Sequence, residues 1–105
     1  MRSLNQLVTQ TRNLAKKFPG PHWNPEVRFV DLVEEVGELA NAILVKEKHK
    51  SKKRQRADLA DSLCDSIFNI FMLADHYQID LDKEYQQVLK QVRERIKKGD
   101  FKHIP

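Results

Sequence analysis

One short stretch of the sequence, LVEEVGELANAI, gathers carboxylates at spacings that bring side chains together on a helix. Glu34, Glu35 and Glu38 fall within about one and a half helical turns, and Asp31 precedes them by one turn. Like charges at such spacings cost roughly a few tenths of a kcal/mol per pair unless something positive lies among them. The stretch therefore indicates either a cation site or a solvated acidic face, and Arg28 is a candidate partner for Asp31.

A second acidic group follows in ADLADSLCDSIFN. Asp58, Asp61 and Asp65 are three and four residues apart and share one stripe of a helix, which Asn69 continues. Two such rows would repel each other if they faced across a bundle, so solvent or cations must lie between them. Because the 19 Lys and Arg residues are concentrated elsewhere, we favour a metal site. Mg²⁺ is the expected ion, with Mn²⁺ as a substitute, since both prefer oxygen ligands.

The run from Lys46 to Arg56, KEKHKSKKRQR, contains seven Lys or Arg residues and one Glu. Such a run indicates contact with phosphate, or an exposed segment that favours solubility. We expect phosphate contact for Lys46 and Arg56, which border the neighbouring helices. We expect solvent exposure for residues 48–54.

Four helices must position these groups. Apolar periodicity and turn signals predict helices over about residues 3–17, 25–48, 56–77 and 81–98, with FPGPHWNP separating the first two. The second helix carries an apolar stripe that we expect to form core: Phe29, Leu32, Val33, Val36, Leu39, Ala40 and Ile43. The 105 residues therefore predict one all-α domain of the four-helix bundle type, residues 1–105. Because the domain is small, we expect a second copy to complete its core.

The sequence also bounds the surroundings of the protein. No apolar run approaches the roughly 20 residues that a membrane span needs. The single cysteine, Cys64, cannot form an internal disulfide, which favours a reducing compartment. We therefore expect a cytoplasmic protein without a membrane partner.

The acidic motifs resemble those of a known family. Glu34-Glu35-x-x-Glu38, followed after a basic loop by LADSLCD and LADHYQIDLD, is similar to the MazG-like nucleotide pyrophosphohydrolases of the all-α NTP pyrophosphatase superfamily. The resemblance covers roughly residues 25–85. It implies a bundle that forms a homodimer or homotetramer, binds Mg²⁺, and hydrolyses a nucleoside triphosphate between its α and β phosphates to a monophosphate and pyrophosphate.

The resemblance also implies roles for particular residues. Glu35 and Glu38 would be metal ligands, and Glu34 a further ligand or the group that orients water. The partner motif of the family is usually Glu-x-x-Asp, which puts the family aspartate at Asp65 and leaves Ser62 where glutamate is expected. Asp61, or the pair Asp58 and Asp61, would have to supply the missing carboxylate.

Two further residues are candidates for substrate binding. Trp23 stands just before the acidic helix, where relatives often place a base-contacting aromatic; the alternative is a tryptophan that covers the bundle core. Asn69 lies one turn beyond Asp65, where it would touch ribose or base, or else continue a polar stripe at a subunit interface. His22 is expected on the surface, and Phe68 and Met72 are expected to pack.

The leading hypothesis is thus an Mg²⁺-dependent NTP or dNTP pyrophosphohydrolase. One alternative is a basic helical module that binds nucleic acid or regulates another protein, although nucleic acid is the less favoured partner. The other is a catalytically inactive family member that acts by oligomeric interaction.

Overall fold

The computed structural model describes residues 1–20 and 22–100, so Pro21 and residues 101–105 of the predicted domain lie outside the described residues. Within that range the chain is all-α, as predicted. The elements are α1 (Leu4–Ala15), α2 (Pro25–Lys46), the 3₁₀ helix η1 (Lys52–Arg54), α3 (Leu59–His76) and α4 (Leu81–Lys98).

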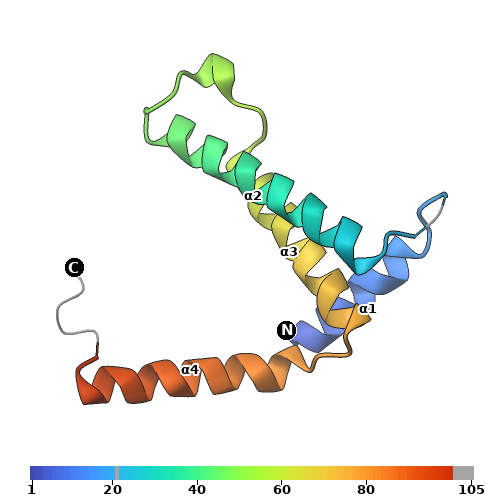
Figure 1. Cartoon of the computed structure of the whole chain (residues 1–105), viewed down its shortest axis with the longest axis vertical. Helices are drawn as coiled ribbons and strands as arrows, with labels where there is room; N and C mark the ends of the chain where they lie inside the picture. Colours follow the sequence, from blue (N-terminus) through green and yellow to red (C-terminus); the bar gives the residue numbers. More distant parts are fainter. Residues whose placement is uncertain (21, 101–105) are drawn as a thin grey trace.

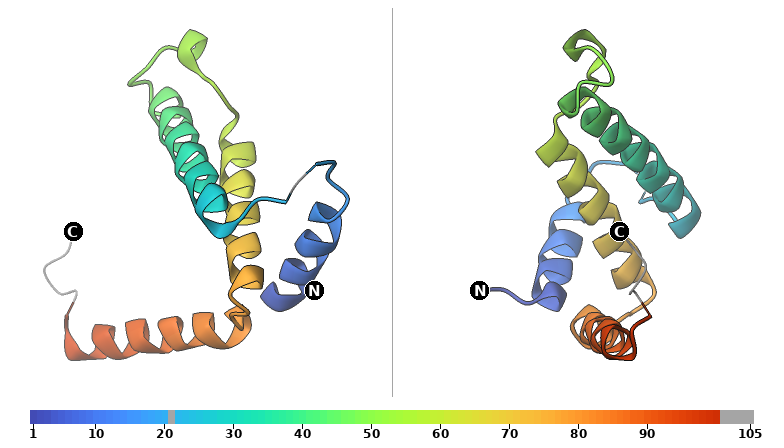
Figure 2. Two further views of the ribbon diagram at one scale, coloured as in Figure 1. Left: turned by 45° about the vertical axis from the view of Figure 1, so that its right-hand side comes forward. Right: turned by 90° about the vertical axis from the view of Figure 1, so that its left-hand side faces the viewer.

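An α-helical hairpin forms the centre of the molecule. α2 and α3 run antiparallel and side by side, and α1 packs against α3 (Figures 1 and 2). α4 touches α1 near its own start and then runs away from the hairpin, while η1 and its loop lie at the opposite end of α2 (Figure 1). The four helices of a single chain therefore do not close into a bundle. None of the described helices has the length and hydropathy needed to cross a membrane.

Side-chain caps set where α2 and α3 begin. Asn24 accepts a hydrogen bond from the backbone N–H of Val27 at 2.9 Å, and Pro25 occupies the first position of α2, where its missing N–H costs nothing. The Asp58 carboxylate accepts hydrogen bonds from the N–H groups of Ala60 and Asp61. α3 therefore begins at Leu59 rather than near residue 56, and Asp58 lies just outside it.

Local backbone turns end the first three helices slightly earlier than predicted. α2 ends at Lys46 because Lys48 has a φ of 64°, which lets the N–H of His49 bond back to the Leu44 carbonyl at 2.8 Å. α3 ends at His76 in the same way, with Gln78 at a φ of 55°. α1 ends at Ala15, since Lys17 and the residue after it bond three residues back and tighten the turn.

The N-termini of α1 and α4 cap each other. Asp82 of α4 accepts hydrogen bonds from the N–H groups of Leu4, at 2.9 Å, and Asn5, at 3.3 Å. In return, the Asn5 side chain accepts from the N–H of Leu81 at 2.9 Å and donates to Asp80 at 2.8 Å. The hydrogen bond from Asn5 lowers the pKa of the Asp80 carboxyl. Because the first N–H groups of a helix lack partners within it, this exchange holds the two helix starts together.

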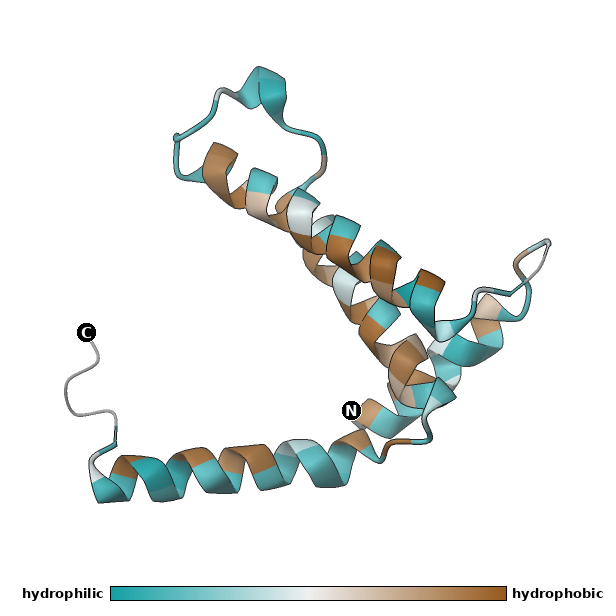
Figure 3. Ribbon diagram, in the orientation of Figure 1, coloured by the Kyte–Doolittle hydropathy of each residue, from teal (hydrophilic) through white to brown (hydrophobic). Residues whose placement is uncertain are grey.

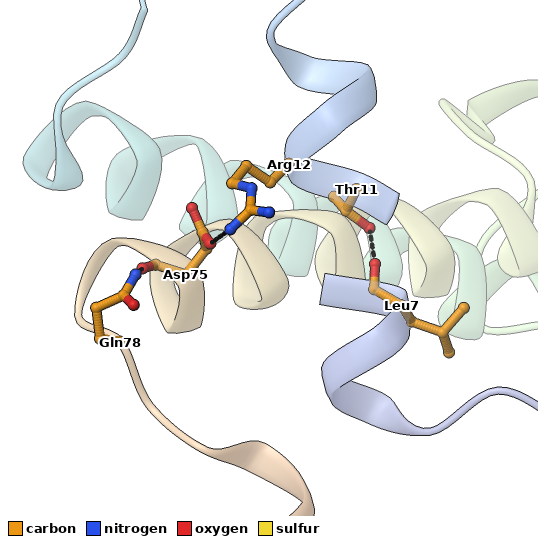
Figure 4. Close-up of polar contacts among 5 residues, drawn as sticks. All are labelled: Leu7, Thr11, Arg12, Asp75 and Gln78. Atoms are coloured by element: carbon orange, nitrogen blue, oxygen red, sulfur yellow. Dashed lines mark hydrogen bonds and ion pairs between the residues drawn. The ribbon is translucent and has the colours of Figure 1, made fainter. Parts of the chain in front are cut away.

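An ion pair holds α1 to the far end of α3. Arg12 Nη1 lies 3.1 Å from Asp75 Oδ1, and Figure 4 shows the two side chains meeting between the helices. The Asp75 carbonyl accepts a hydrogen bond from the side chain of Gln78, where α3 ends. The Thr11 hydroxyl, by contrast, donates within its own helix to the Leu7 carbonyl at 2.8 Å (Figure 4). α1 is thus fixed to α3 by Arg12 and to α4 by its N-terminus.

The apolar stripe of α2 does not form the core of a single chain, so that prediction is wrong at this level. Five of its seven members are exposed: Phe29, Val33, Val36, Ala40 and Ile43. The reason is that α2 turns its polar side toward α3, and the apolar residues buried in one chain are few and mostly small, namely Val8, Ala15, Ala42 and Ala74. Figure 3 shows apolar positions along the hairpin and along α4.

We predict that replacing Asn5 with Ala lowers the free energy of unfolding by about 1–2 kcal/mol, because the change leaves helix-start N–H groups without their partner. Urea unfolding at one fixed protein concentration measures the effect. Asn13→Ala, an exposed asparagine of the same helix, is the matched control and should cause little loss. Equal stability of the Asn5 variant and wild type would contradict the capping exchange.

Candidate active site

The facing sides of α2 and α3 carry small and polar side chains. Ser62, Ser66 and Asn69 of α3 are buried, and so is Asn41 of α2. Ser66 is satisfied within its own helix, where its hydroxyl donates to the Ser62 carbonyl at 2.9 Å. The interface between α2 and α3 therefore shields polar side chains from bulk water without surrounding them with large apolar side chains.

A cavity of about 530 Å³ opens where this polar interface meets α1 and the loop before α2. The side chains around it combine aromatic rings, one cation and three carboxylates. They are Ala15, Phe18, Pro19, His22, Trp23, Arg28, Asp31, Glu35, Asp65, Phe68 and Asn69. Arg28 and Glu35 are seven residues apart on α2, or about 10 Å along its axis. The cavity therefore offers an aromatic region near Arg28 and an acidic region near Glu35.

The aromatic region is organised around Arg28. Its guanidinium lies 4.9 Å from the centre of the Trp23 ring and 5.9 Å from that of Phe68, which are cation–π distances. Phe68 in turn stacks on Phe18, with ring centres 6.1 Å apart. Burial lowers the pKa of the Arg28 guanidinium and the charge of Asp31 opposes that effect, but an arginine remains charged at neutral pH.

Asn69 joins the aromatic and acidic regions. Its side-chain oxygen accepts a hydrogen bond from Arg28 Nη1 at 3.1 Å, and its nitrogen donates to Asp31 Oδ2 at 2.8 Å. Arg28 and Asp31 are thus connected through a buried amide, in place of the direct pairing that their spacing suggests. Asn69 is 2% exposed, so its orientation, and with it that of both charged groups, is fixed by packing.

Glu35 is the carboxylate with the most perturbed surroundings in the acidic region. Burial raises the pKa of the Glu35 carboxyl, and the charges of Glu38, Asp65, Asp31 and Glu34 raise it further. Its Oε2 atom is buried and has no hydrogen-bond partner among the described residues. A buried oxygen without a donor, surrounded by four other carboxylates, is the environment that a cation would stabilise.

The carboxylates fit a divalent cation by ligand type, but they are not already drawn together around one point. Among the described residues, no group of three His, Cys, Asp or Glu side chains has the arrangement of a complete ion site. Glu35, Asp31 and Asp65 line one cavity, and Glu38 is close enough to Glu35 to raise its pKa. The carboxylate oxygens are therefore suitable ligands for a divalent cation, but they do not converge on one position.

The register of the hairpin explains the position of Ser62. Residue 31 of α2 contacts residue 69 of α3, and residues 35 and 65 line the same cavity. Continuing this antiparallel register by one turn puts residue 62 opposite Glu38. Ser62 is 0% exposed, and its hydroxyl oxygen is buried without a partner among the described residues.

The other two aspartates of the predicted site, Asp58 and Asp61, are placed differently from Asp65. The Asp58 carboxylate caps the helix, as described above. Asp61 is exposed and does not line the cavity, and it is not among the charges that raise the pKa of Glu35. The structure therefore brings Asp65, and neither Asp58 nor Asp61, to the carboxylates of α2.

The remaining candidates divide between the two ends of the hairpin. Trp23 and Asn69 line the cavity, whereas Arg56 lines a separate pocket in the basic loop. Lys46 is exposed at the end of α2, eleven residues or about 16 Å beyond Glu35. Met72 contributes to a small neighbouring pocket.

Several lining residues were not among the predicted site residues. Phe68, expected only to pack, lies against Arg28 and lines the cavity. His22 and Phe18 line the cavity as well. Asp31 was recognised as part of the acidic group from its spacing of four residues to Glu35, but it was not assigned to the site. The aromatic residues could not be found in this way, because they come from the segment between α1 and α2 and from α3, whose approach no local pattern encodes.

Comparison with known proteins agrees with this combination of helical hairpin and acidic cavity. The family model described as MazG nucleotide pyrophosphohydrolase domain matches residues 25–99. Because that range covers more than half of the chain, the protein belongs to the MazG nucleotide pyrophosphohydrolase family. Membership implies a function of the nucleotide pyrophosphohydrolase kind.

A more particular relative is known from Bacillus subtilis (strain 168). The chain is 34% identical over 89 residues to a protein described there as the uncharacterized protein YvdC, and the match covers 77% of this chain and 79% of that one. No solved structure matches the chain.

We predict that Glu35→Gln raises the stability of the metal-free protein at neutral pH. A carboxyl whose pKa is raised by folding contributes stability below its unfolded value, near pH 4.5, and that contribution is lost as pH rises through the folded pKa. The difference in free energy of unfolding between variant and wild type should therefore grow as pH rises above 4.5. Urea unfolding in EDTA across this range measures it.

Glu94→Gln, which removes an exposed carboxylate of α4, is the control and should show no such growth. A difference that stays flat with pH, or shrinks, would contradict the crowding of charge around Glu35.

Proposed function

We propose that this protein is an Mg²⁺-dependent nucleoside triphosphate pyrophosphohydrolase that cleaves an NTP or dNTP between the α and β phosphates. The products are a nucleoside monophosphate and pyrophosphate, and Mn²⁺ would substitute for Mg²⁺. The observation that carries the proposal is the buried Oε2 of Glu35, which has no hydrogen-bond partner among residues 1–20 and 22–100 and lies near four other carboxylates, in a cavity that also has aromatic walls. A nucleotide has both parts, a ring that stacks and a charged tail that binds through a cation.

In this proposal Glu35, Glu38 and Asp65 hold the cation, and Asp31 is a further candidate. When bound, Mg²⁺ would neutralise the phosphates and polarise a phosphoryl oxygen. Glu34 is exposed beside this group, where it can accept a proton from an attacking water or orient it. Asp58 and Asp61 are outside this proposed set, because the Asp58 carboxylate caps α3 and Asp61 is exposed and does not line the cavity.

The aromatic region would bind the base. Trp23 is half exposed, so one face of its ring is available for stacking while Arg28 lies against the ring. Phe18 and Phe68 form the neighbouring wall. Asn69 is hydrogen-bonded at both ends of its amide, to Arg28 and to Asp31, which supports a positioning role for this residue more than a direct contact with ribose or base.

We predict that Asp65→Asn lowers turnover by a factor of about 100 or more, since even an outer partner of a metal ligand is worth about 10- to 100-fold. Asp61→Asn, four residues earlier on the same helix, is the matched control and should keep most of the activity. Pyrophosphate release from a panel of canonical and modified NTPs with Mg²⁺ measures turnover. Trp23, the single tryptophan, reports nucleotide binding by its fluorescence. The reverse order of the two variants would refute this ligand set.

The second candidate is a catalytically inactive member of the family. Ser62 favours it, because a serine supplies no charge where the family usually has glutamate. Ser62 is buried opposite Glu38, and its hydroxyl has no partner in the part of the chain that the structure describes. Failure to turn over any nucleotide in the panel, together with no rise in Tm on addition of Mg²⁺, would establish this alternative over the enzyme.

We further propose that the chain forms a homodimer or homotetramer through its exposed apolar faces. Leu63, Ile67 and Ile70 form such a face on α3, and Val88 and Val92 continue the pattern on α4. Apolar surface of this extent on one small chain favours burial against another copy, because removal of such area from water is stabilising.

We predict that wild-type protein has a molar mass in solution that is a multiple of 12.4 kDa, and that Ile67→Glu shifts it toward the monomer by burying a charge in the interface. Sedimentation equilibrium measures both. Gln10→Glu, an exposed position on α1, is the control and should leave the mass unchanged. A monomeric wild type would rule out this assembly.

A further inference from the structure

A second concave site lies at the other end of the hairpin, in the basic loop. A pocket of about 430 Å³ is lined by Asn41, Lys50, Lys53, Arg54, Gln55 and Arg56, and we refer to it as the basic pocket. Four of these side chains are cations, two are amides, and none of the described lining residues is acidic. The basic pocket shares no lining residue with the acidic cavity.

The basic pocket is held in shape by a buried side chain. Asn41 is 4% exposed, and its side-chain amide forms two hydrogen bonds with the backbone of the loop. Its Nδ2 donates to the Arg54 carbonyl at 3.3 Å, and its Oδ1 accepts from the N–H of Arg56 at 3.1 Å. Just before these two points, the turn of η1 is closed by a hydrogen bond from the N–H of Arg54 to the Ser51 carbonyl at 3.0 Å. The loop is thus anchored to α2 in one conformation.

The charges of the basic pocket are not balanced by neighbouring carboxylates. Among the described residues, none of its four cations forms an ion pair; the pairs present are Arg12 with Asp75 and Arg95 with Asp100. Cations gathered around one concavity repel each other, and an anion placed among them would relieve that repulsion. Lys and Arg together suit phosphate oxygens, because the Lys ammonium is a compact positive charge and the Arg guanidinium donates several hydrogen bonds in one plane.

We propose that the basic pocket binds a condensed phosphate, that is, a diphosphate or triphosphate group, without Mg²⁺ and independently of the acidic cavity. Its shape favours a compact anion over nucleic acid, whose phosphates are spread along a strand and would need a longer track of cations. The ligand is either a free condensed phosphate or the phosphate tail of a nucleotide. This inference does not depend on the proposed enzymatic activity.

The test is calorimetric titration of the full chain with inorganic tripolyphosphate in EDTA, so that binding through a metal in the acidic cavity is excluded. Wild type should bind one equivalent per chain. The double variant Lys53→Ala with Arg54→Ala should weaken binding by at least about tenfold, since a hydrogen bond to a charged group is worth about this much. Lys97→Ala with Lys98→Ala, at the end of α4, removes the same net charge and should change affinity less than about twofold.

Asn41→Ala tests whether the arrangement of the charges matters, because it leaves every cation in place and removes only the anchor of the loop. It should weaken tripolyphosphate binding by a similar factor while far-UV circular dichroism shows the helices intact. If this variant does not fold, the two double variants decide the matter by themselves.

Nucleotide arms separate the two sources of the ligand. ATP binding as tightly as tripolyphosphate, with AMP not binding, indicates recognition of a nucleotide tail, whereas exclusion of ATP indicates a free condensed phosphate. The proposal is overturned if wild type does not bind tripolyphosphate, if both double variants lose affinity equally, or if a DNA duplex of about 20 base pairs binds more tightly than tripolyphosphate.

Discussion

α2 and α3 pack against each other through their polar sides, and the other features of the chain depend on this pairing. Serine and asparagine side chains occupy the buried interface between α2 and α3, which we call the seam, and Ser62 and Asn69 are almost fully removed from solvent. The carboxylates that flank the seam are therefore partly desolvated without being embedded in hydrocarbon. Because α2 and α3 pair through their polar sides, their apolar sides face outward. One chain by itself therefore buries few large apolar side chains.

Within this interface, Asn69 keeps Arg28 and Asp31 from forming a direct ion pair. Had Arg28 and Asp31 met each other, both would have been neutralised locally and neither would present charge to the cavity. The intervening amide satisfies one hydrogen bond of each, while the guanidinium lies against aromatic rings and the charge of Asp31 still acts on Glu35. A neutral side chain with one donor and one acceptor end suits this position, and an acid or a lysine would not.

The helices could be predicted from the sequence because their signals are local. The span of α4 was predicted to the residue, since Asp80 and Gly99 mark its ends, and the late start of α3 follows from the cap at Asp58. Which side of α2 faces inward could not be predicted, because a stripe such as Phe29, Val33 and Val36 reads as core whether it packs within the chain or against a copy. The acidic residues of the site were recognisable by spacing, whereas Phe18 and Phe68 meet only in the folded chain.

The boundary of the family match has a consequence for how this cavity can change. The match begins at Pro25, and the carboxylates come after it. Phe18, His22 and Trp23, which supply much of the aromatic wall, all come before it, in α1's exit and the loop that follows. Under the proposed function, the aromatic residues that would select the ligand and the carboxylates that would hold the cation therefore come largely from separate stretches of the chain, so that mutation of the first would change what the protein accepts while the second is left intact.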